Sequence, residues 1–278
     1  MTLLRTFANL WTLWDHPAAG PDEWSLEQKV SAIKSAGFDG VMGDPGAGVG
    51  ALAREHGLKF IACRRLDDSD DMPALLAQCR SEGAMALQVH LGTHDTSAEE
   101  ALALAMRLYA AAQEVGLEVV VETHRNSCIE TLEKTDALGE DFRVATGKAL
   151  PLVFDFSHLA VVMDVQPPFA RTLLTDRWAV FSARWHHLRP FNGQHAQIPV
   201  LAPDGSLAPE MADWLNFVAE LLRLLQAGPR EELWVCPEIG PLRGGYNLAA
   251  YAASWRQAVA LRHLLLELWA ANPAARTY

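Results

Sequence analysis

The stretch Pro151-Leu-Val-Phe-Asp-Phe-Ser-His158 decides the fold of this chain. Its apolar residues run up to Asp155, and His158 follows three residues later. This pattern predicts a buried strand that ends in a carboxylate and is followed by an imidazole. Because a buried carboxylate is costly unless its charge is balanced, we expect a cation at this strand end, and a divalent metal ion is the usual one.

Three other predicted strands end in groups of the same kind. They are Val119-Val-Val-Glu-Thr-His124 with Glu122, Ala183-Arg-Trp-His-His-Leu-Arg189 with His187, and Leu233-Trp-Val-Cys-Pro-Glu238 with Glu238. We predict that these four strand ends meet at one metal ion. A set of two glutamates, one aspartate and one histidine suits Mn²⁺, Mg²⁺ or Zn²⁺.

A pattern of helix, glycine and apolar strand recurs through the first half of the chain. The glycines that end the predicted helices are Gly37, Gly57, Gly83 and Gly116. Capping boxes at Ser25 with Gln28 and at Ser97 with Glu100 mark two of the helix starts. Strands that alternate with helices predict a parallel sheet covered by helices, and continuous apolar strands fit burial on both faces.

The second half repeats this pattern with less regular spacing. The first strand is expected over 3–10. In the second half we expect helices within 128–138, near 168–175, over 210–226 and over 248–270. The strands expected there are the Asp155 strand, 179–189 and 232–238, with a loop over 190–209. Eight strand–helix units predict a (β/α)8 TIM barrel, with residues 1–278 as a single domain. A doubly wound open sheet is the alternative, but no Gly-x-Gly-x-x-Gly turn follows the first strand.

Composition excludes some classes of protein. The net charge is −11 and no basic run occurs, which argues against a nucleic-acid-binding protein. No signal peptide and no membrane-spanning apolar run is evident, so we expect a cytoplasmic location and no membrane partner. The four cysteines show no paired spacing and are expected to be free thiols.

In a β/α barrel the functional groups lie at the C-terminal ends of the strands. This rule selects Asn9, Trp11, Asp44, His90, Glu122, His124, Asp155, His158, His187, Arg189 and Glu238. Without a cation, repulsion among three carboxylates in one cavity would raise their pKa values. In the alternative interpretation, these carboxylates form ordinary ion pairs with Arg125, Arg184 or Arg243.

The histidines differ in their value as candidates. Strand alternation places Trp185, His187 and Arg189 on one face and His186 on the other, so we choose His187 as the metal ligand. His158 is a candidate for contacting substrate or orienting a ligand. The remaining loop histidines, His90, His94, His124 and His195, are weaker candidates, because a lone loop histidine is usually solvated.

These residues resemble the motifs of the xylose isomerase-like TIM-barrel superfamily, the sugar phosphate isomerase/epimerase group. The similar motifs are Val121-Glu-Thr-His-Arg125, Asp155-Phe-Ser-His158, His187-Leu-Arg189 and Pro237-Glu-Ile-Gly-Pro241, and the resemblance covers nearly the whole chain. It implies one divalent metal held by Glu122, Asp155, His187 and Glu238, with Glu122 and Glu238 as the catalytic acid/base pair. It also implies substrate contacts from His158 and Arg189, and Gln197 resembles a loop glutamine of some members.

Two departures from the family pattern stand out. The second strand ends in Gly43-Asp44-Pro45, where many members place a glutamate. The arginine of the epimerases lies farther beyond the histidine than Arg189 does. The candidate substrate-binding residues, taken together, are His158, Arg189, His124, His90, Gln197 and His195.

The resemblance implies an isomerase or epimerase of a ketose or related polyol, with glutamate-mediated proton transfer through an enediolate that the metal stabilises. The expected partner is a small sugar or sugar-like substrate, and a homo-oligomer is one expected state of assembly. Three alternatives stay open: an inosose dehydratase-like lyase, an AP-endonuclease-like phosphodiesterase, and a non-catalytic sugar or metal binder. We expect specificity to lie in loops 11–24, 43–48 and 190–209, where Trp11, Trp14 and Phe191 are candidates for stacking on a sugar ring.

Overall fold

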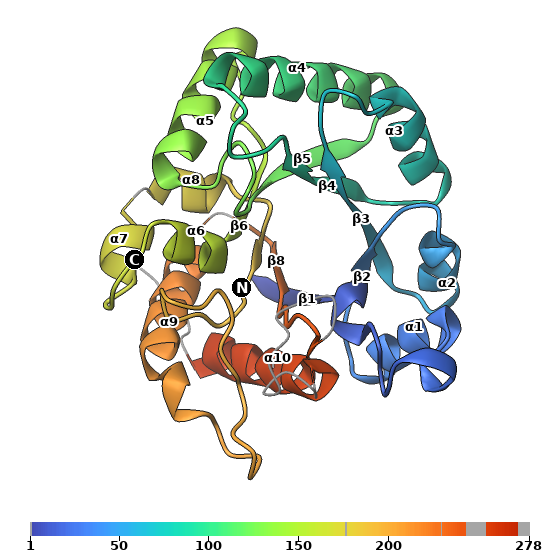
Figure 1. The fold of residues 1–278 in the computed structure, drawn as a ribbon, viewed down its shortest axis with the longest axis vertical. Helices are drawn as coiled ribbons and strands as arrows, with labels where there is room; N and C mark the ends of the chain where they lie inside the picture. The colour runs from blue at the N-terminus through green and yellow to red at the C-terminus, as the bar shows by residue number, and fades with distance from the viewer. Residues whose placement is uncertain (1, 176, 229, 243–253, 272–278) are drawn as a thin grey trace.

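The computed structural model describes residues 2–175, 177–228, 230–242 and 254–271. Eight parallel strands close into one barrel, with β8 paired to β1 and helices outside the ring (Figure 1). The strands are β1 Leu3–Asn9, β2 Gly40–Gly43, β3 Lys59–Leu66, β4 Ala86–Leu91, β5 Glu118–Thr123, β6 Leu152–Asp155, β7 Trp185–His187 and β8 Glu232–Cys236. The predicted (β/α)8 barrel is confirmed, and the doubly wound alternative is wrong.

The helices follow the strands in the expected alternation. They are α1 Leu26–Ser35, α2 Val49–Glu55, α3 Met72–Ser81, α4 Ala98–Val115, α5 Leu132–Thr146, α6 Phe156–Val162, α7 Ala170–Leu173, α8 Arg177–Ser182, α9 Ala212–Gln226 and α10 Ser254–Ala271, with short 3-10 helices over Leu10–Leu13, Gly20–Asp22 and Pro209–Met211. Both predicted capping boxes are present, at the starts of α1 and α4. Gly116 ends α4 in the left-handed conformation, with φ of 64°.

Three predicted elements have different boundaries. The strand expected over 179–189 is only Trp185–His187, because α8 occupies the preceding segment. Short apolar runs fit a strand or a buried helix equally well, and here Val180 and Ala183 are buried against the core. The helix expected within 128–138 extends to Thr146 and ends at Gly147. Of the helix expected over 248–270, residues 248–253 lie outside the described residues.

The barrel interior is filled by its own layer of side chains. Inward-facing residues from consecutive strands form this cluster, which contains Phe7, Met42, Ile61, Ala86, Val120, Val153 and Trp185. Phe7 stacks on Trp234 with ring centroids 4.3 Å apart, and a Cβ at Gly40 would collide with the Phe7 ring. This apolar layer closes the barrel below the strand ends, so polar strand-end groups above it face a shielded cavity.

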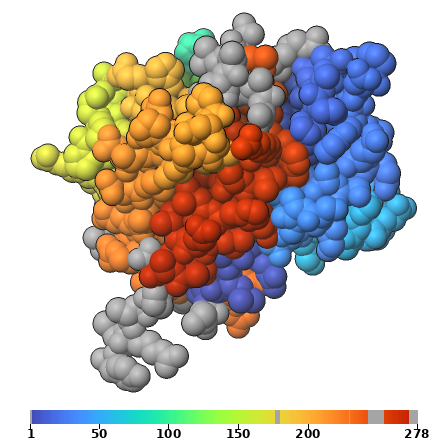
Figure 2. Space-filling view, turned by 90° about the horizontal axis from the view of Figure 1, so that it is seen from below, coloured from blue at the N-terminus to red at the C-terminus, as the bar shows by residue number. Residues whose placement is uncertain are grey.

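The last described helix, α10, packs against the first strand of the barrel. Figure 2 shows α10 between α9 and the N-terminal helices, and α10 contacts both α9 and β1. Two hydrogen bonds fix it: Ser254 Oγ donates to the Thr12 carbonyl at 2.8 Å, and Arg262 Nε donates to Thr6 Oγ1 at 2.9 Å. Within the described residues, no helix is both long enough and apolar enough to cross a bilayer.

We predict that Phe7→Ala lowers the free energy of unfolding by roughly 3–5 kcal/mol, because it leaves a void inside a closed layer. Urea denaturation followed by circular dichroism measures this change. Leu3→Ala is the matched control on the same strand, because Leu3 is 51% exposed and its truncation should change stability by no more than about 0.5 kcal/mol. Equal losses in both variants would contradict the role given to the interior layer.

Candidate active site

A cavity of about 460 Å³ opens at the C-terminal ends of the strands. Its walls include most of the predicted strand-end residues, namely Asn9, Trp11, Asp44, His90, Glu122, His124, His158, His187, Arg189 and Glu238. This volume lies within the usual range for small-molecule sites, roughly 300–1,000 Å³. The closed barrel therefore brings together groups that are separated by more than 200 residues in the sequence.

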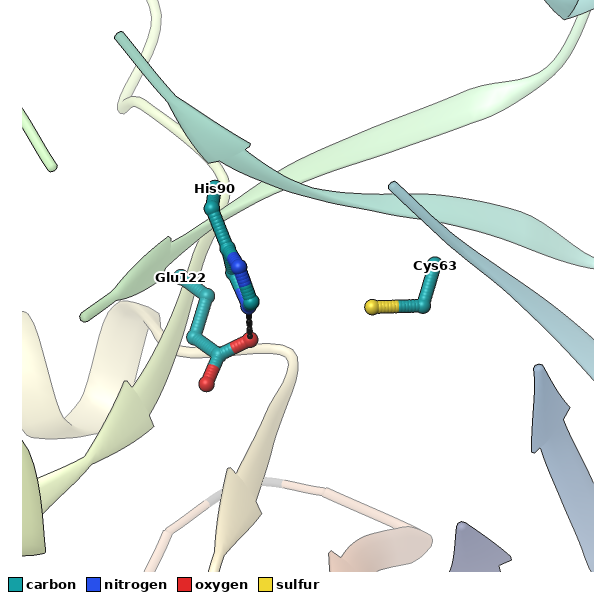
Figure 3. A group of neighbouring side chains, drawn as sticks. All are labelled: Cys63, His90 and Glu122. Carbon is teal, nitrogen blue, oxygen red and sulfur yellow. Dashed lines mark hydrogen bonds and ion pairs between the residues drawn. The ribbon is translucent and has the colours of Figure 1, made fainter. Parts of the chain in front are cut away.

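Glu122, at the end of β5, is fixed by two donors from β4. Its Oε2 accepts a hydrogen bond from Gln88 Nε2. The same oxygen accepts one from His90 Nε2 at 2.8 Å (Figure 3). Its Oε1 lies 3.5 Å from His187 Nδ1. Glu122 is buried, so these contacts hold its carboxylate toward the centre of the cavity.

Gln88 sets the orientation of the His187 ring. The indole Nε1 of Trp185 can only donate, and it donates to Gln88 Oε1 at 2.7 Å. This contact identifies Oε1 as the acceptor, and the same oxygen lies 3.1 Å from His187 Nε2. His187 therefore carries a proton on Nε2 and presents Nδ1 to the carboxylates, 2.8 Å from Glu238 Oε2.

Glu238 lies two residues beyond the end of β8 and is held from three sides. Asn9 Nδ2 donates to its Oε1 at 2.6 Å, and Arg189 Nη2 donates to its Oε2 at 2.6 Å. His187 completes the set. The Arg189 guanidinium also lies over the Trp11 ring, 5.6 Å from its centroid.

Asp155 lies behind the cavity wall, where β6 passes directly into α6. Its Oδ1 caps α6 by accepting from the Ser157 amide at 2.9 Å and from Ser157 Oγ at 2.5 Å. Its Oδ2 is buried and accepts no hydrogen bond from the described residues, although Arg189 Nη2 lies 3.2 Å away. One carboxylate oxygen is thus fixed by the helix start, while the other faces Arg189 and, at 3.5 Å, His158 Nε2.

Three stacked imidazoles form one wall of the cavity. The ring centroids of His90 and His124 are 3.9 Å apart, and those of His124 and His158 are also 3.9 Å apart. His158 is 1% exposed, and among the described residues neither of its ring nitrogens forms a hydrogen bond. A buried donor or acceptor without a partner is costly, so His158 has unused capacity for a bound ligand.

The charges in the site are strongly coupled. Burial raises the pKa of Asp155 to about 6, against the opposing effect of Arg189. Burial lowers the pKa of His187, but Glu122 and Glu238 outweigh it and raise the value to about 9. In the absence of another cation the His187 ring therefore holds a second proton on Nδ1, between the carboxylates.

The donor set fits one divalent metal ion. One donor atom each from Asp155, His187 and Glu238 lie within 4.8 Å of one another, and the same holds for Glu122, Asp155 and His158. The buried Asp155 Oδ2 lacks a hydrogen bond, and a divalent cation at the carboxylates would replace the Nδ1 proton of His187. The residues present therefore suit a cation ligated by oxygen and nitrogen.

Some predicted residues lie elsewhere. Gln197 bonds both polar atoms of its amide to the Gly240 backbone and does not line the cavity. His195 is exposed and contacts Asn192, and Phe191 is buried against Phe169. His186 lies on the helix side of the sheet and stacks with Phe156.

The arginine with site ion pairs, Arg189, was not among the three named in the ion-pair alternative, and of those three Arg125 lines the cavity. Arg184 pairs with Glu118 on β5, and Arg243 lies outside the described residues, whereas Arg189 contacts two of the site carboxylates. Gln88 and Cys63 line the cavity and were not predicted. A lone glutamine within the apolar β4 segment was the available sequence signal for Gln88.

Solved structures show the same fold. L-ribulose 3-epimerase matches with a TM-score of 0.65 and 15% identity, over 97% of this chain and 96% of that chain. The fold is that of the xylose isomerase-like TIM barrels. One such protein from Mycobacterium smegmatis, solved in complex with magnesium, matches with a TM-score of 0.56 and 12% identity, over 95% and 97% of the two chains.

The same fold also supports other chemistry. A probable 3-DHS dehydratase from Bacillus anthracis matches with a TM-score of 0.55 and 14% identity, over 96% of this chain and 99% of that chain. No family model and no curated protein sequence matches this chain. At these identities the comparisons establish the fold, and the activity has to be argued from the site.

We predict that Gln88→Met weakens binding of Mn²⁺ by about 10- to 100-fold, because it removes the acceptor that orients His187 and a donor to Glu122. Isothermal titration calorimetry on metal-free protein measures this affinity. Gln113→Met, on the exposed face of α4, is the matched control and should leave the affinity unchanged. Unchanged affinity in Gln88→Met would contradict the orienting role of Gln88.

Proposed function

We propose that this chain is a divalent-metal-dependent isomerase or epimerase of a small ketose or related polyol. One observation carries the proposal: two buried carboxylates, Glu122 and Glu238, reach the same cavity from different strands and flank the same nitrogen of His187. Paired carboxylates on either side of a bound substrate suit the removal and return of a carbon-bound proton.

Glu122, Asp155, His187 and Glu238 would hold the metal, which we infer to be Mn²⁺, Mg²⁺ or Zn²⁺. When bound, such an ion supplies Lewis-acid polarisation of a carbonyl and makes the adjacent C–H bond more acidic. The fold similarity to a barrel solved with magnesium supports this part of the proposal. The proton transfers are carried out by the side chains.

In the proposed reaction, one glutamate takes the proton from the carbon next to the carbonyl. The C–H electron pair forms a C=C bond, and the carbonyl π electrons move onto the oxygen. The other glutamate returns a proton. Return to the opposite face of the same carbon gives an epimer. Return to the neighbouring carbon, with transfer of the hydroxyl proton to the former carbonyl oxygen, gives an isomer. The contacts from Gln88 and His90 to Glu122, and from Asn9 and Arg189 to Glu238, hold the two carboxylates in place for these transfers.

The cavity walls carry hydrogen-bonding groups and aromatic rings that suit a polyhydroxylated ligand. His158 has two ring nitrogens without hydrogen-bond partners among the described residues, and a substrate hydroxyl would satisfy one of them. Arg189, positioned over Trp11, brings a guanidinium to the same cavity. Trp14 lines the cavity and is 52% exposed, so its ring is available to cover an entering sugar. The fold similarity to L-ribulose 3-epimerase favours a ketose among these ligands.

The proposed metal site is formed by Glu122, Asp155, His187 and Glu238. We expect metal analysis to find about one divalent ion at this site in the parent protein, and loss of that ion in Asp155→Ala. The reason is that the substitution removes the buried Oδ2 that lacks a hydrogen bond. Elemental analysis after dialysis against Mn²⁺ measures the content. Asp141→Ala, at an exposed position on α5, is the control that should keep its metal. Equal content in both variants would contradict the assignment of Asp155.

We further predict that Glu122→Gln and Glu238→Gln each lower turnover of a ketose substrate by about 10²- to 10⁴-fold, the usual contribution of a general acid or base. Nuclear magnetic resonance in deuterated water follows both product formation and exchange of the substrate proton. Glu99→Gln, on the exposed start of α4, is the matched control.

The same assay separates the alternatives. A ketose panel including L-ribulose, together with inososes, tests the substrate class. Exchange without epimerisation in one glutamine variant would identify the remaining glutamate as the base. Full turnover in both variants would contradict the acid/base pair, and an unsaturated product from an inosose would indicate the dehydratase reaction instead.

A further inference from the structure

The side chains of Cys63, His90 and Glu122 form a second group of metal-ligating atoms beside the first. They come from three consecutive strands, β3, β4 and β5, and all three line the cavity (Figure 3). One donor atom from each lies within 4.8 Å of the other two. The proton transfers proposed above do not use Cys63, so its place in the cavity wall needs another explanation.

Gln88 separates this group from the first. Its Nε2 lies 3.9 Å from Cys63 Sγ and donates to Glu122 Oε2, while its Oε1 faces His187. Glu122 also contacts both groups, because its Oε2 faces His90 and its Oε1 faces His187. The carboxylate of Glu122 is thus placed to serve one cation on each side.

The chemistry of the second group differs from that of the first. A thiolate, an imidazole and a carboxylate are the ligand types of zinc, and three protein ligands leave one position for water or a substrate oxygen. The first group consists of Glu122, Asp155, His187 and Glu238, and none of these side chains contains sulfur. The thiol therefore distinguishes a soft site from a hard one in the same cavity.

The distances are close to those of a bound ion. In a tetrahedral zinc site, bonds of ~2.3 Å to sulfur and ~2.0–2.2 Å to nitrogen or oxygen place the ligand atoms about 3.5 Å apart. His90 Nε2 and Glu122 Oε2 already lie 2.8 Å apart, joined by a hydrogen bond that a cation would replace. The Cys63 sulfur lies within 4.8 Å of a ligand atom of each partner, so a shift of about 1 Å would bring it to the spacing of a bound ion.

We propose that Cys63, His90 and Glu122 bind a second divalent cation, with zinc as the natural occupant, and that Glu122 is shared between the two sites. The proposal rests on the proposed function only through Glu122. It concerns binding of a metal, so it is tested without any assay of isomerisation.

Cobalt provides the probe, because a thiolate bound to Co²⁺ gives a near-ultraviolet charge-transfer band that oxygen and nitrogen ligands do not give. Metal-free protein is titrated with Co²⁺ while this band and the bound cobalt are measured. We expect the parent protein to bind about two equivalents of Co²⁺. The charge-transfer band should reach its maximum when one of these two ions is bound. Cys63→Ser should lose the band and about one equivalent.

Matched variants keep the two sites distinguishable. Cys79→Ala, in α3 outside the barrel, and Cys236→Ala, two residues before Glu238, should both keep the band. Asp155→Ala should lose the first ion but keep the band. His90→Gln gives an independent test if Cys63→Ser proves unstable in thermal unfolding, and it should also lose the band.

Two outcomes overturn the proposal: no charge-transfer band in the parent at saturating Co²⁺, or a band that survives in both Cys63→Ser and His90→Gln. In either case the metal content of the first site can still be measured in the same titration. Failure of the second site is therefore separable from failure of the proposed function, which depends on Asp155 and the glutamate pair.

Discussion

The burial of three neighbouring carboxylates is the constraint on which this site depends. Glu122, Asp155 and Glu238 are each no more than 3% exposed. Their charges are balanced within the protein by Arg189 and by a doubly protonated His187, whose pKa lies at about 9. This balance is incomplete, since burial still raises the pKa of Asp155 to about 6. A cation among these groups would complete it, and the proposed metal has that role.

The packing of the barrel interior is coupled to the chemistry above it. Trp185 belongs to the apolar layer inside the barrel, yet its indole proton fixes Gln88. Gln88 in turn fixes both Glu122 and His187. A change in the interior layer would therefore reach two proposed metal ligands through one amide, although none of the seven buried residues named for that layer lines the cavity.

Asp155 shows how local structure and site chemistry share one residue. Its Oδ1 caps helix α6 by accepting hydrogen bonds from Ser157, which leaves Oδ2 facing Arg189 and His158. Serine and aspartate are common in such caps for this reason. The cap makes the orientation of the carboxylate a property of the backbone, so its direction is set without a metal ion.

Periodicity and caps made much of the fold predictable, because they are local properties. The capping boxes at Ser25 and Ser97, the glycines after the helices and the apolar strands all act within a few residues. The segment before Trp185 was predicted wrongly because a short apolar run fits two structures, and only packing against the core selects the helix α8. Gln88 was missed because its partners lie up to 99 residues away.

The same division applies to the site. The sequence by itself determined which polar groups stand at the ends of apolar strands, since the strand pattern and the two-residue alternation are local. Only the tertiary structure decided that Arg189 joins the carboxylates, that Gln197 binds the Gly240 backbone, and that Cys63 faces His90 and Glu122. The physical reason is that closure of the barrel brings eight distant strand ends to one rim, and distances across that rim are set by packing and not by spacing along the chain.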